Sequence, residues 1–213
     1  KAVRLLLNSY EKDKYPKLSV RKNWIHTIET LVLKNQDEFA KNISEDFMQR
    51  SKDEMYLTEV LPVISAARHA KKNLKIWMKP KKIPTSPIFW FGKSKLICQP
   101  QGVVLIISPW NYPLQLSLIP TINALSAGNR VIIKPSEKTP KFSLLLEKII
   151  STYFDKSIIQ VLNGDLSFSK DLLSKLFKRC TLTSRLARMS VGKAPSAVRP
   201  TCGHGEARRT TAP

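Results

Sequence analysis

The sequence predicts an α/β fold, in which N-terminal helices are followed by half of a parallel sheet built from strand–helix units. Three observations carry this prediction. Apolar residues recur at helical spacing over residues 20–78. From residue 103 onward, short runs rich in Val and Ile alternate with helical segments, which is typical of right-handed crossovers in a parallel sheet. Beyond residue 177 no hydrophobic period is sustained, so this basic tail is predicted to be disordered.

Two amphipathic helices are predicted before residue 80. Over residues 20–50 and 54–78, apolar side chains recur three and four positions apart, which places them on one helix face. Pro62 is expected in or near the first turns of the second helix, because a deeper proline would kink it. The apolar positions are Trp24, Ile25, Ile28, Leu31, Val32 and Phe39 in the first helix, and Leu57, Val60, Leu61, Ile64, Ala67, Leu74 and Trp77 in the second.

The strand–helix part begins after a short strand within residues 94–100, which is expected to form half of a hairpin. Three such units ordinarily need further strands to cover both sheet edges, so the fold is expected to be incomplete. The predicted organisation is a helical segment with a short strand (1–100), a partial dinucleotide-binding domain (101–177) and a basic tail (178–213). The predicted elements are strand 103–107, helix 113–127, strand 130–133, helix 139–154, strand 158–162 and helix 167–177.

The formal net charge of +20 over 213 residues would suggest a nucleic acid or an anionic membrane as partner, but its distribution argues against a specific nucleic-acid site. Residues 1–177 hold 28 Lys and Arg against 15 Asp and Glu, with lysine outnumbering arginine 23 to 5. Residues 178–213 hold 8 against 1, and arginine leads 6 to 2. The composition of the tail therefore differs from that of the rest of the chain, as it would after a shifted reading frame or a fusion. A basic nucleic-acid binder remains an alternative.

A lysine-rich helix end allows a second alternative. The lysines near Trp77 and Phe89-Trp90-Phe91 would form an anion-binding patch with stacking aromatic rings, or simply a solvated helix end followed by an apolar loop. These lysines are Lys71, Lys72, Lys75, Lys79, Lys81 and Lys82.

The cysteine pattern predicts neither a metal site nor a disulfide framework. Cys98, Cys180 and Cys202 have no metal-ligand spacing and are read as free thiols. Cys202 beside His204 would allow a reactive pair, but a glycine-rich tail offers no scaffold to hold it. No apolar run approaches the roughly 20 residues of a membrane span, and the first seven residues are too short for a signal sequence. The cytoplasm is the expected location, and the absence of an initiating methionine suggests that the true N-terminus is not represented.

Two strand ends carry the candidate site. The strand at 103–107 stops at Pro109-Trp110-Asn111-Tyr112-Pro113, and the next stops at Lys134-Pro135-Ser136-Glu137, as expected where parallel strands end at a ligand crevice. Asn111 offers a neutral amide donor, or caps the helix that begins near Pro113. Lys134 and Glu137 would bond ribose hydroxyls, or form an exposed ion pair. Trp110 would line the same cleft, or anchor the core.

Together these segments closely resemble the aldehyde dehydrogenase superfamily, and most of all its class-3 type, which includes fatty-aldehyde and coniferyl-aldehyde dehydrogenases. The resemblance implies a Rossmann-like domain, with Asn111 helping to hold the reacting oxyanion and Lys134–Glu137 meeting the adenosine ribose of the cofactor. The implied cofactor is NAD, with NADP possible, because Glu137 would repel a 2′-phosphate. Similar residues of that type stand at Ser51, Glu54, Glu59-Val60-Leu61-Pro62, Arg68-His69-Ala70 and Trp77-Met78-Lys79-Pro80-Lys81-Lys82.

The resemblance runs from the N-terminus to about Phe177. Beyond this point the family pattern has a Phe-Thr-Gly-Ser turn facing the pyrophosphate, a Glu-Leu-Gly-Gly segment with the general base, and a nucleophilic cysteine, none of which can be read in the chain. The resemblance therefore implies a truncated aldehyde dehydrogenase, whose intact relatives are homodimers that oxidise an aldehyde to a carboxylic acid with NAD(P)+ through a cysteine thiohemiacetal. The alternative is a catalytically inactive remnant that only binds nucleotide weakly or associates with a subunit.

We predict that the purified chain shows no NAD-dependent oxidation of aromatic or long-chain aldehydes, because the thiol and the base of the family pattern are both missing. The measurement is NADH absorbance with each aldehyde. Turnover that survives simultaneous substitution of the cysteines (Cys98→Ser, Cys180→Ser and Cys202→Ser) would contradict this account. Turnover lost in Cys202→Ser alone would instead assign a function to the tail.

Overall fold

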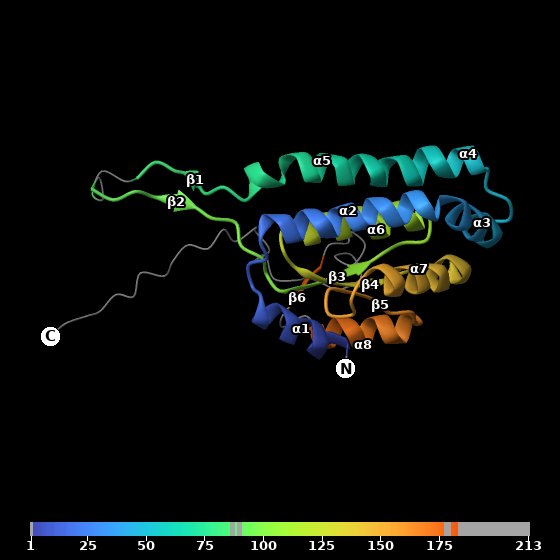
Figure 1. Cartoon of the computed structure of the whole chain (residues 1–213). Coiled ribbons are helices and arrows are strands. Elements are labelled where there is room, and N and C mark those ends of the chain that lie inside the picture. Colours follow the sequence, from blue (N-terminus) through green and yellow to red (C-terminus); the bar gives the residue numbers. More distant parts are fainter. Residues whose placement is uncertain (1, 86–87, 89–90, 177–179, 183–213) are drawn as a thin grey trace.

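The chain folds around a parallel sheet with helices on both faces, which confirms the predicted α/β class (Figure 1). The computed structural model describes residues 2–85, 88, 91–176 and 180–182, and only the backbone at 175, 176 and 180–182. The predicted disorder of the tail beyond residue 182, and the reading of Cys202 as a nucleophile, lie outside the described residues.

The sheet consists of β3 (Val103–Ile107), β4 (Arg130–Lys134), β5 (Ile159–Val161) and β6 (Cys180–Leu182), in the spatial order β5-β4-β3-β6. All three neighbouring pairs are parallel. From β3 the chain proceeds to β4 and β5 on one side, and then crosses to place β6 on the other side of β3. The order of the strands therefore reverses beside β3, and such a topological switch point is where doubly wound sheets bind ligands.

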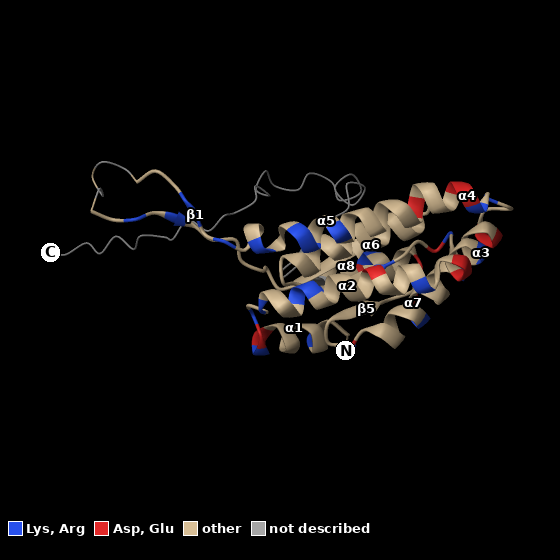
Figure 2. Cartoon of the chain, turned by 45° about the horizontal axis from the view of Figure 1, so that its top comes forward, with Lys and Arg blue, Asp and Glu red and all other residues tan. Residues whose placement is uncertain are grey.

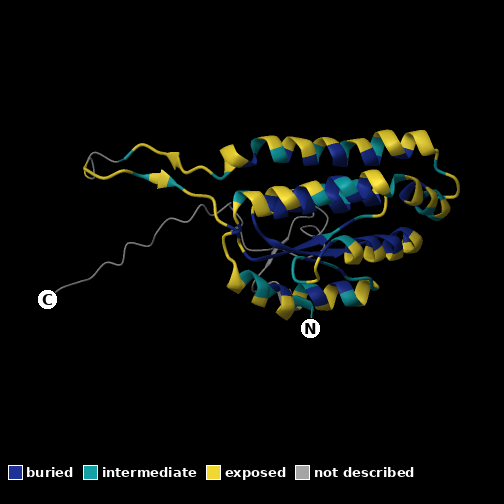
Figure 3. Ribbon diagram, in the orientation of Figure 1, coloured by how far each residue is buried: buried dark blue, intermediate teal, exposed yellow. Residues whose placement is uncertain are grey.

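Alternate residues of the strands face two separate cores, because side chains in a strand alternate between the faces of the sheet. Val103 and Leu105 face a smaller core with Leu6 of α1 (Ala2–Lys12) and Leu172 of α8 (Leu166–Leu176). Val104, Ile106, Val131 and Ile133 face a larger core on the other side. Burial on both sides explains why the central strands read as continuous apolar runs rather than as an alternation (Figure 3).

The larger core is covered by α2 (Leu18–Lys34), α3 (Gln36–Asp46), α5 (Leu61–Trp77), α6 (Pro113–Ser126) and α7 (Pro140–Tyr153). Glu29 of α2 joins the two long helices: it is 6% exposed, and it accepts hydrogen bonds from Arg68 and Lys71 of α5. Lys71 of the lysine-rich helix end therefore pairs with a carboxylate. Lys and Arg are distributed over α1, α2, α5 and β1 (Figure 2). Phe89 and Trp90 of the alternative anion patch lie outside the described residues.

The second predicted helix is confirmed in extent, but it contains an irregular turn. It runs without a break through α4 (Lys52–Met55), the π-helical segment η1 (Tyr56–Val60) and α5. Pro62, expected near the start of a helix, therefore lies ten residues into a continuous helical run. The π turn directly before it relieves the clash that a proline ring makes with the carbonyl of the residue four positions earlier.

Helix α1 was not predicted. Its apolar residues Val3, Leu6, Leu7 and Tyr10 recur at helical spacing. The segment is short, and we considered it only as a signal sequence, for which it is too short. The helix covers the edge of the smaller core through Leu6, which is fully buried. The Tyr10 hydroxyl donates to the carbonyl of Pro100, 3.0 Å away, which ties the helix to the segment that enters the sheet.

The predicted short strand is confirmed as β2 (Lys95–Leu96), which pairs antiparallel with β1 (Lys81–Lys82). This two-stranded arm projects from the end of α5 (Figure 1). Large apolar side chains are exposed along it: Ile83, Ile88, Phe91 and Ile97. Within the described residues, no helix is long and apolar enough to cross a membrane.

The predicted boundary after residue 177 was wrong. Residues 180–182 form β6 and pair in parallel with β3, from Val103 opposite Cys180 to Leu105 opposite Leu182. The domain therefore continues into the segment that we assigned to the tail. Composition misled this prediction, because a three-residue strand is too short to show a period.

Candidate functional site

The two predicted strand-end loops lie on the same edge of the sheet. Strands β3 and β4 are parallel neighbours in register, with Ile107 opposite Lys134, and the N–H of Ser108 donates to the carbonyl of Lys134 at 3.0 Å. Beyond the strands, the Lys138 ammonium lies 5.6 Å from the centre of the Trp110 ring. The loops that carry Asn111 and Glu137 therefore adjoin each other at the carboxyl edge, beside the switch point.

Lys134 is held as a buried cation with a partly exposed partner. Its side chain is 2% exposed, and Nζ donates to Oε2 of Glu137 at 2.8 Å. The Glu137 side chain is 47% exposed, and the hydrogen bond from Lys134 lowers the pKa of its carboxyl group. The alternative of an exposed surface pair is therefore wrong for Lys134, because a buried lysine requires its counter-ion.

A pocket of about 270 Å³ opens beside this ion pair, between the ends of β4 and β5. It is smaller than the roughly 300–1,000 Å³ of sites that enclose a whole drug-sized ligand, so it suits one part of a dinucleotide. Among the described residues, Oδ1 of Asn163 is buried without a hydrogen-bond partner, and it belongs to the pocket wall. A Cβ atom at Gly164 would stand 2.4 Å from the Phe168 ring. The lining residues are Pro135, Ser136, Glu137, Pro140, Ser143, Leu144, Asn163 and Gly164.

These features fit the adenosine half of a nicotinamide cofactor. An acceptor without a partner, a carboxylate with solvent access and a space of limited size are together at the end of β4 and β5. The sequence pointed to Lys134 and Glu137 but not to Asn163. The turn at Asn163-Gly164 after an apolar strand was the available signal.

Trp110 is 47% exposed, so the alternative of a core anchor is wrong. Its ring stacks on Phe47 at 5.9 Å between centroids and an interplanar angle of 25°. With Lys138 also near the ring, Trp110 lies where the two strand-end loops and the end of α3 meet.

The alternative in which Asn111 caps α6 is also wrong. Tyr112 occupies the cap position and makes no side-chain cap hydrogen bond, and among the described residues none runs from the Asn111 side chain to the helix. The first N–H groups of α6 meet a carboxylate from another helix instead: Oε2 of Glu59 accepts from Leu114 N at 2.7 Å and from Gln115 N at 3.4 Å. The amide of Asn111, which is exposed, is therefore left for another partner.

Glu59 and Arg50 are residues that the sequence did not single out for this site. Glu59 is fully buried in η1, and Nη1 of Arg50 donates to its Oε1 at 2.9 Å. Nη2 of the same guanidinium donates to the carbonyl of Asn111 at 3.0 Å. Burial raises the pKa of Glu59 to about 7, although Arg50 and the α6 N–H groups favour its charged form. A glutamate within an apolar helical stripe was the signal that would have found it.

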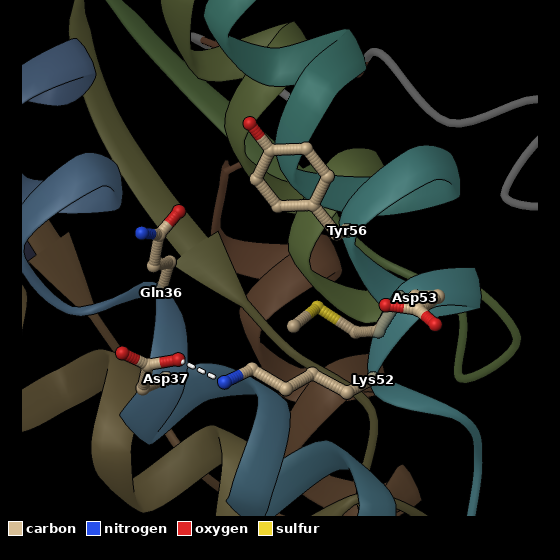
Figure 4. A pocket seen from close by; sticks show the side chains of 6 residues that line it. Gln36, Asp37, Lys52, Asp53 and Tyr56 are labelled. Atoms are coloured by element: carbon tan, nitrogen blue, oxygen red, sulfur yellow. Dashed lines mark ion pairs between the residues drawn. The ribbon is translucent and has the colours of Figure 1, made fainter.

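A second pocket of about 220 Å³ lies between α3 and α4, away from the strand ends (Figure 4). The lysine of its lining is paired with one of the two aspartates, since Lys52 Nζ lies 2.6 Å from Oδ1 of Asp37. Within the described residues no three His, Cys, Asp or Glu side chains gather as a metal site. Neither feature competes with the strand-end pocket as a functional site.

The doubly wound parallel sheet, with a pocket and polar loops at its carboxyl edge, places the chain among the Rossmann-like α/β folds, which bind ligands at that edge. Residues 10–183 match the model of the aldehyde dehydrogenase family, and the chain belongs to that family. The match continues past Phe177, where we had placed the end of the resemblance, and agrees with the pairing of β6.

Individual relatives agree with the family. The chain is 37% identical over 166 residues to a probable coniferyl aldehyde dehydrogenase of Pseudomonas aeruginosa, covering 76% of this chain and 35% of that protein. It is 38% identical over 156 residues to one of Caulobacter vibrioides, covering 72% and 32%. The substrate-bound structure of Staphylococcus aureus AldH aligns with a TM-score of 0.77 at 30% identity, over 81% of this chain and 37% of that one. The chain thus spans about a third of the length of these relatives.

Burial of Glu59 predicts a pH-dependent stability. Its pKa is about 7 in the folded chain against an ordinary value of 4.5, so between these values the folded state holds a proton that the unfolded state has released. The contribution to the free energy of unfolding is complete below pH 4.5 and is lost as the pH rises through 7, by about 3 kcal/mol. Urea unfolding between about pH 5 and 8 measures it, with Glu59→Gln as a variant that cannot titrate. Equal pH slopes for the two proteins would contradict the assignment.

Proposed function

We propose that this chain is the N-terminal, cofactor-binding part of an NAD(P)-dependent aldehyde dehydrogenase, with Asn111 as oxyanion donor and Lys134 and Glu137 as ribose ligands. One observation carries the proposal: the Asn111 loop and the Lys134–Glu137 turn follow adjacent parallel strands and lie on one edge beside the switch point. Family membership gives this edge its chemistry.

The proposed reaction oxidises an aldehyde to a carboxylic acid. When a thiolate attacks the carbonyl carbon, negative charge develops on the carbonyl oxygen. The Asn111 amide stabilises that charge as a neutral donor, and a preorganised donor of this kind contributes about 2.7–4 kcal/mol. The bound nicotinamide cofactor supplies the hydride acceptor. The nucleophile and the general base are not readable in these 213 residues.

The residues around β4 favour NAD as the cofactor, with NADP as the alternative. The Glu137 carboxylate, kept ionised by Lys134, accepts hydrogen bonds from ribose hydroxyls and repels a 2′-phosphate. Trp110 lines the same edge. The proposed location is the cytoplasm, because Cys98 is a free, exposed thiol of the kind that a reducing compartment maintains.

Nucleotide titration followed by amide NMR tests this proposal. NAD and adenosine should each shift Ser136, Glu137, Asn163 and Gly164 in a saturable manner, and NADP should shift them less. Binding is expected to be too weak to raise the melting temperature, because the pyrophosphate-binding turn is not readable in the chain. Glu137→Gln should weaken the shifts by removing the ribose acceptor.

Glu45→Gln is the matched control for this titration, because Glu45 forms an equally short ion pair, 2.8 Å from Lys141, and neither residue lines the pocket. Its titration should match that of the unchanged protein. Shifts that do not saturate, or that are equal in Glu137→Gln and the unchanged protein, would contradict the assignment.

A subunit-association role is the second candidate, and the exposed apolar residues of the β1–β2 arm favour it. Ile88 is 82% exposed, and Phe91 is 90% exposed. Several large exposed apolar side chains on one short arm are typical of protein interfaces, and we propose that the arm contributes to a homodimer or to contact with an intact subunit.

Sedimentation velocity tests the association. The chain should self-associate as its concentration rises, and Ile97→Asp should shift it towards monomer by placing a charge within the buried face. Leu33→Asp, at an exposed apolar position on α2, is the control and should leave association unchanged. Sedimentation of the Ile97→Asp protein that equals that of the unchanged chain would exclude the arm as the interface.

A further inference from the structure

We infer that Arg50 and Glu59 are positioning residues that hold the Asn111 loop in its working conformation. The inference rests on the proposed function for the purpose of that loop, but the contacts stand by themselves. The Arg50 guanidinium donates in two directions, to Glu59 at 2.9 Å and to the Asn111 carbonyl at 3.0 Å. The Glu59 carboxylate in turn holds the first N–H groups of α6, directly after the loop. Both ends of the loop are therefore tied to one ion pair.

The backbone before Arg50 is bent to bring it there. Met48 and Gln49 have φ values of 53° and 83°, the left-handed region that residues other than glycine rarely adopt. The N–H of Gln49 donates to the carbonyl of Ser44 at 3.0 Å, which closes the end of α3. Two consecutive residues in this region persist only where the surrounding structure determines them, and they occur preferentially at functional sites.

The backbone around Glu59 is equally unusual. Glu59 lies in the π-helical turn η1, a rare form that is frequently found at functional sites. The turn brings the Glu59 carboxylate into the apolar interface between η1 and α6. There it is shielded from water, and its hydrogen-bond donors are Arg50 and the N–H groups of α6. Two rare backbone features therefore supply the two members of one ion pair.

Aromatic rings confine the guanidinium between the loop and α3. Its central carbon lies 4.0 Å from the centre of the Phe47 ring and 5.4 Å from that of Tyr112. Phe47 also stacks on Trp110. Residues on both sides of Asn111 are thus fixed by contacts that do not use its side chain. A donor that is fixed in advance needs no reorganisation when charge develops, which is what an oxyanion site requires.

The test is loop order in the full chain carrying Arg50→Lys. Lysine keeps the charge beside Glu59 and so preserves the buried pair, but it lacks the fork that reaches Asn111 at the same time. NMR relaxation should show the order parameters of Trp110, Asn111 and Tyr112 falling from about 0.85 to below about 0.6, with β3 and β4 unchanged. Arg68→Lys is the control: it alters another Arg–Glu bond, at 2.7 Å, and should leave the loop ordered.

A loop that stays rigid in Arg50→Lys would overturn the inference, as would order lost equally in the strands. Nucleotide titration of the same variant separates this result from the proposed function. If Arg50→Lys keeps a rigid loop and nucleotide still gives saturable shifts at Glu137, only the positioning role of Arg50 and Glu59 is refuted. If the Arg50→Lys loop is mobile but nucleotide gives no shifts in the unchanged protein, only the cofactor assignment is refuted.

Discussion

The carboxylate of Glu59, buried against the N-terminus of α6, is the interaction on which the candidate site depends. It brings together the helical run that begins at Lys52, the helix that follows β3, and Arg50. A carboxylate in this position satisfies N–H groups that a helix cannot pair internally, and it meets the positive end of the helix dipole. Without it, the loop between β3 and α6 would have to provide its own cap from Asn111 or Tyr112. Because Glu59 meets the first N–H groups of α6, the side-chain amide of Asn111 is left for another partner.

Much of the sheet could be predicted from the sequence, because its elements are long or continuously apolar. The run Val103–Ile107 is buried on both faces, so every residue in it contributes to the pattern. Helix α6 ends at Ser126, one residue before the predicted end at 127, and Gly128 follows it with a φ of 92°. The positions of Lys134 and Asn111 followed from the general rule that polar residues at parallel strand ends share one edge. Their chemistry, in contrast, came from the resemblance to a family.

The rest depended on long-range contacts that leave little local signal. Glu59 is one polar residue in an apolar helix face, and its partners lie 9 and 55 positions away in the chain. Arg50 follows a turn whose left-handed residues are Met48 and Gln49, where a glycine would have marked the bend. Strand β6 is three residues long, and its extended conformation depends on pairing with β3. Helix α1 is stabilised by burial of Leu6 against the sheet more than by its own sequence.

The burial of Lys134 has a consequence for any molecule that enters the neighbouring pocket. The ammonium group is already paired with Glu137, so the proposed ribose ligands occupy each other when the pocket is empty. A hydroxyl that approaches Glu137 must share this acceptor with Lys134, whereas Oδ1 of Asn163 in the same pocket wall has no hydrogen-bond partner among the described residues. The net affinity is therefore the free-energy difference between the Lys134–Glu137 hydrogen bond in the empty pocket and the arrangement that also includes the ligand. Such a site favours reversible capture and release over tight retention, which suits a molecule that has to leave after each use.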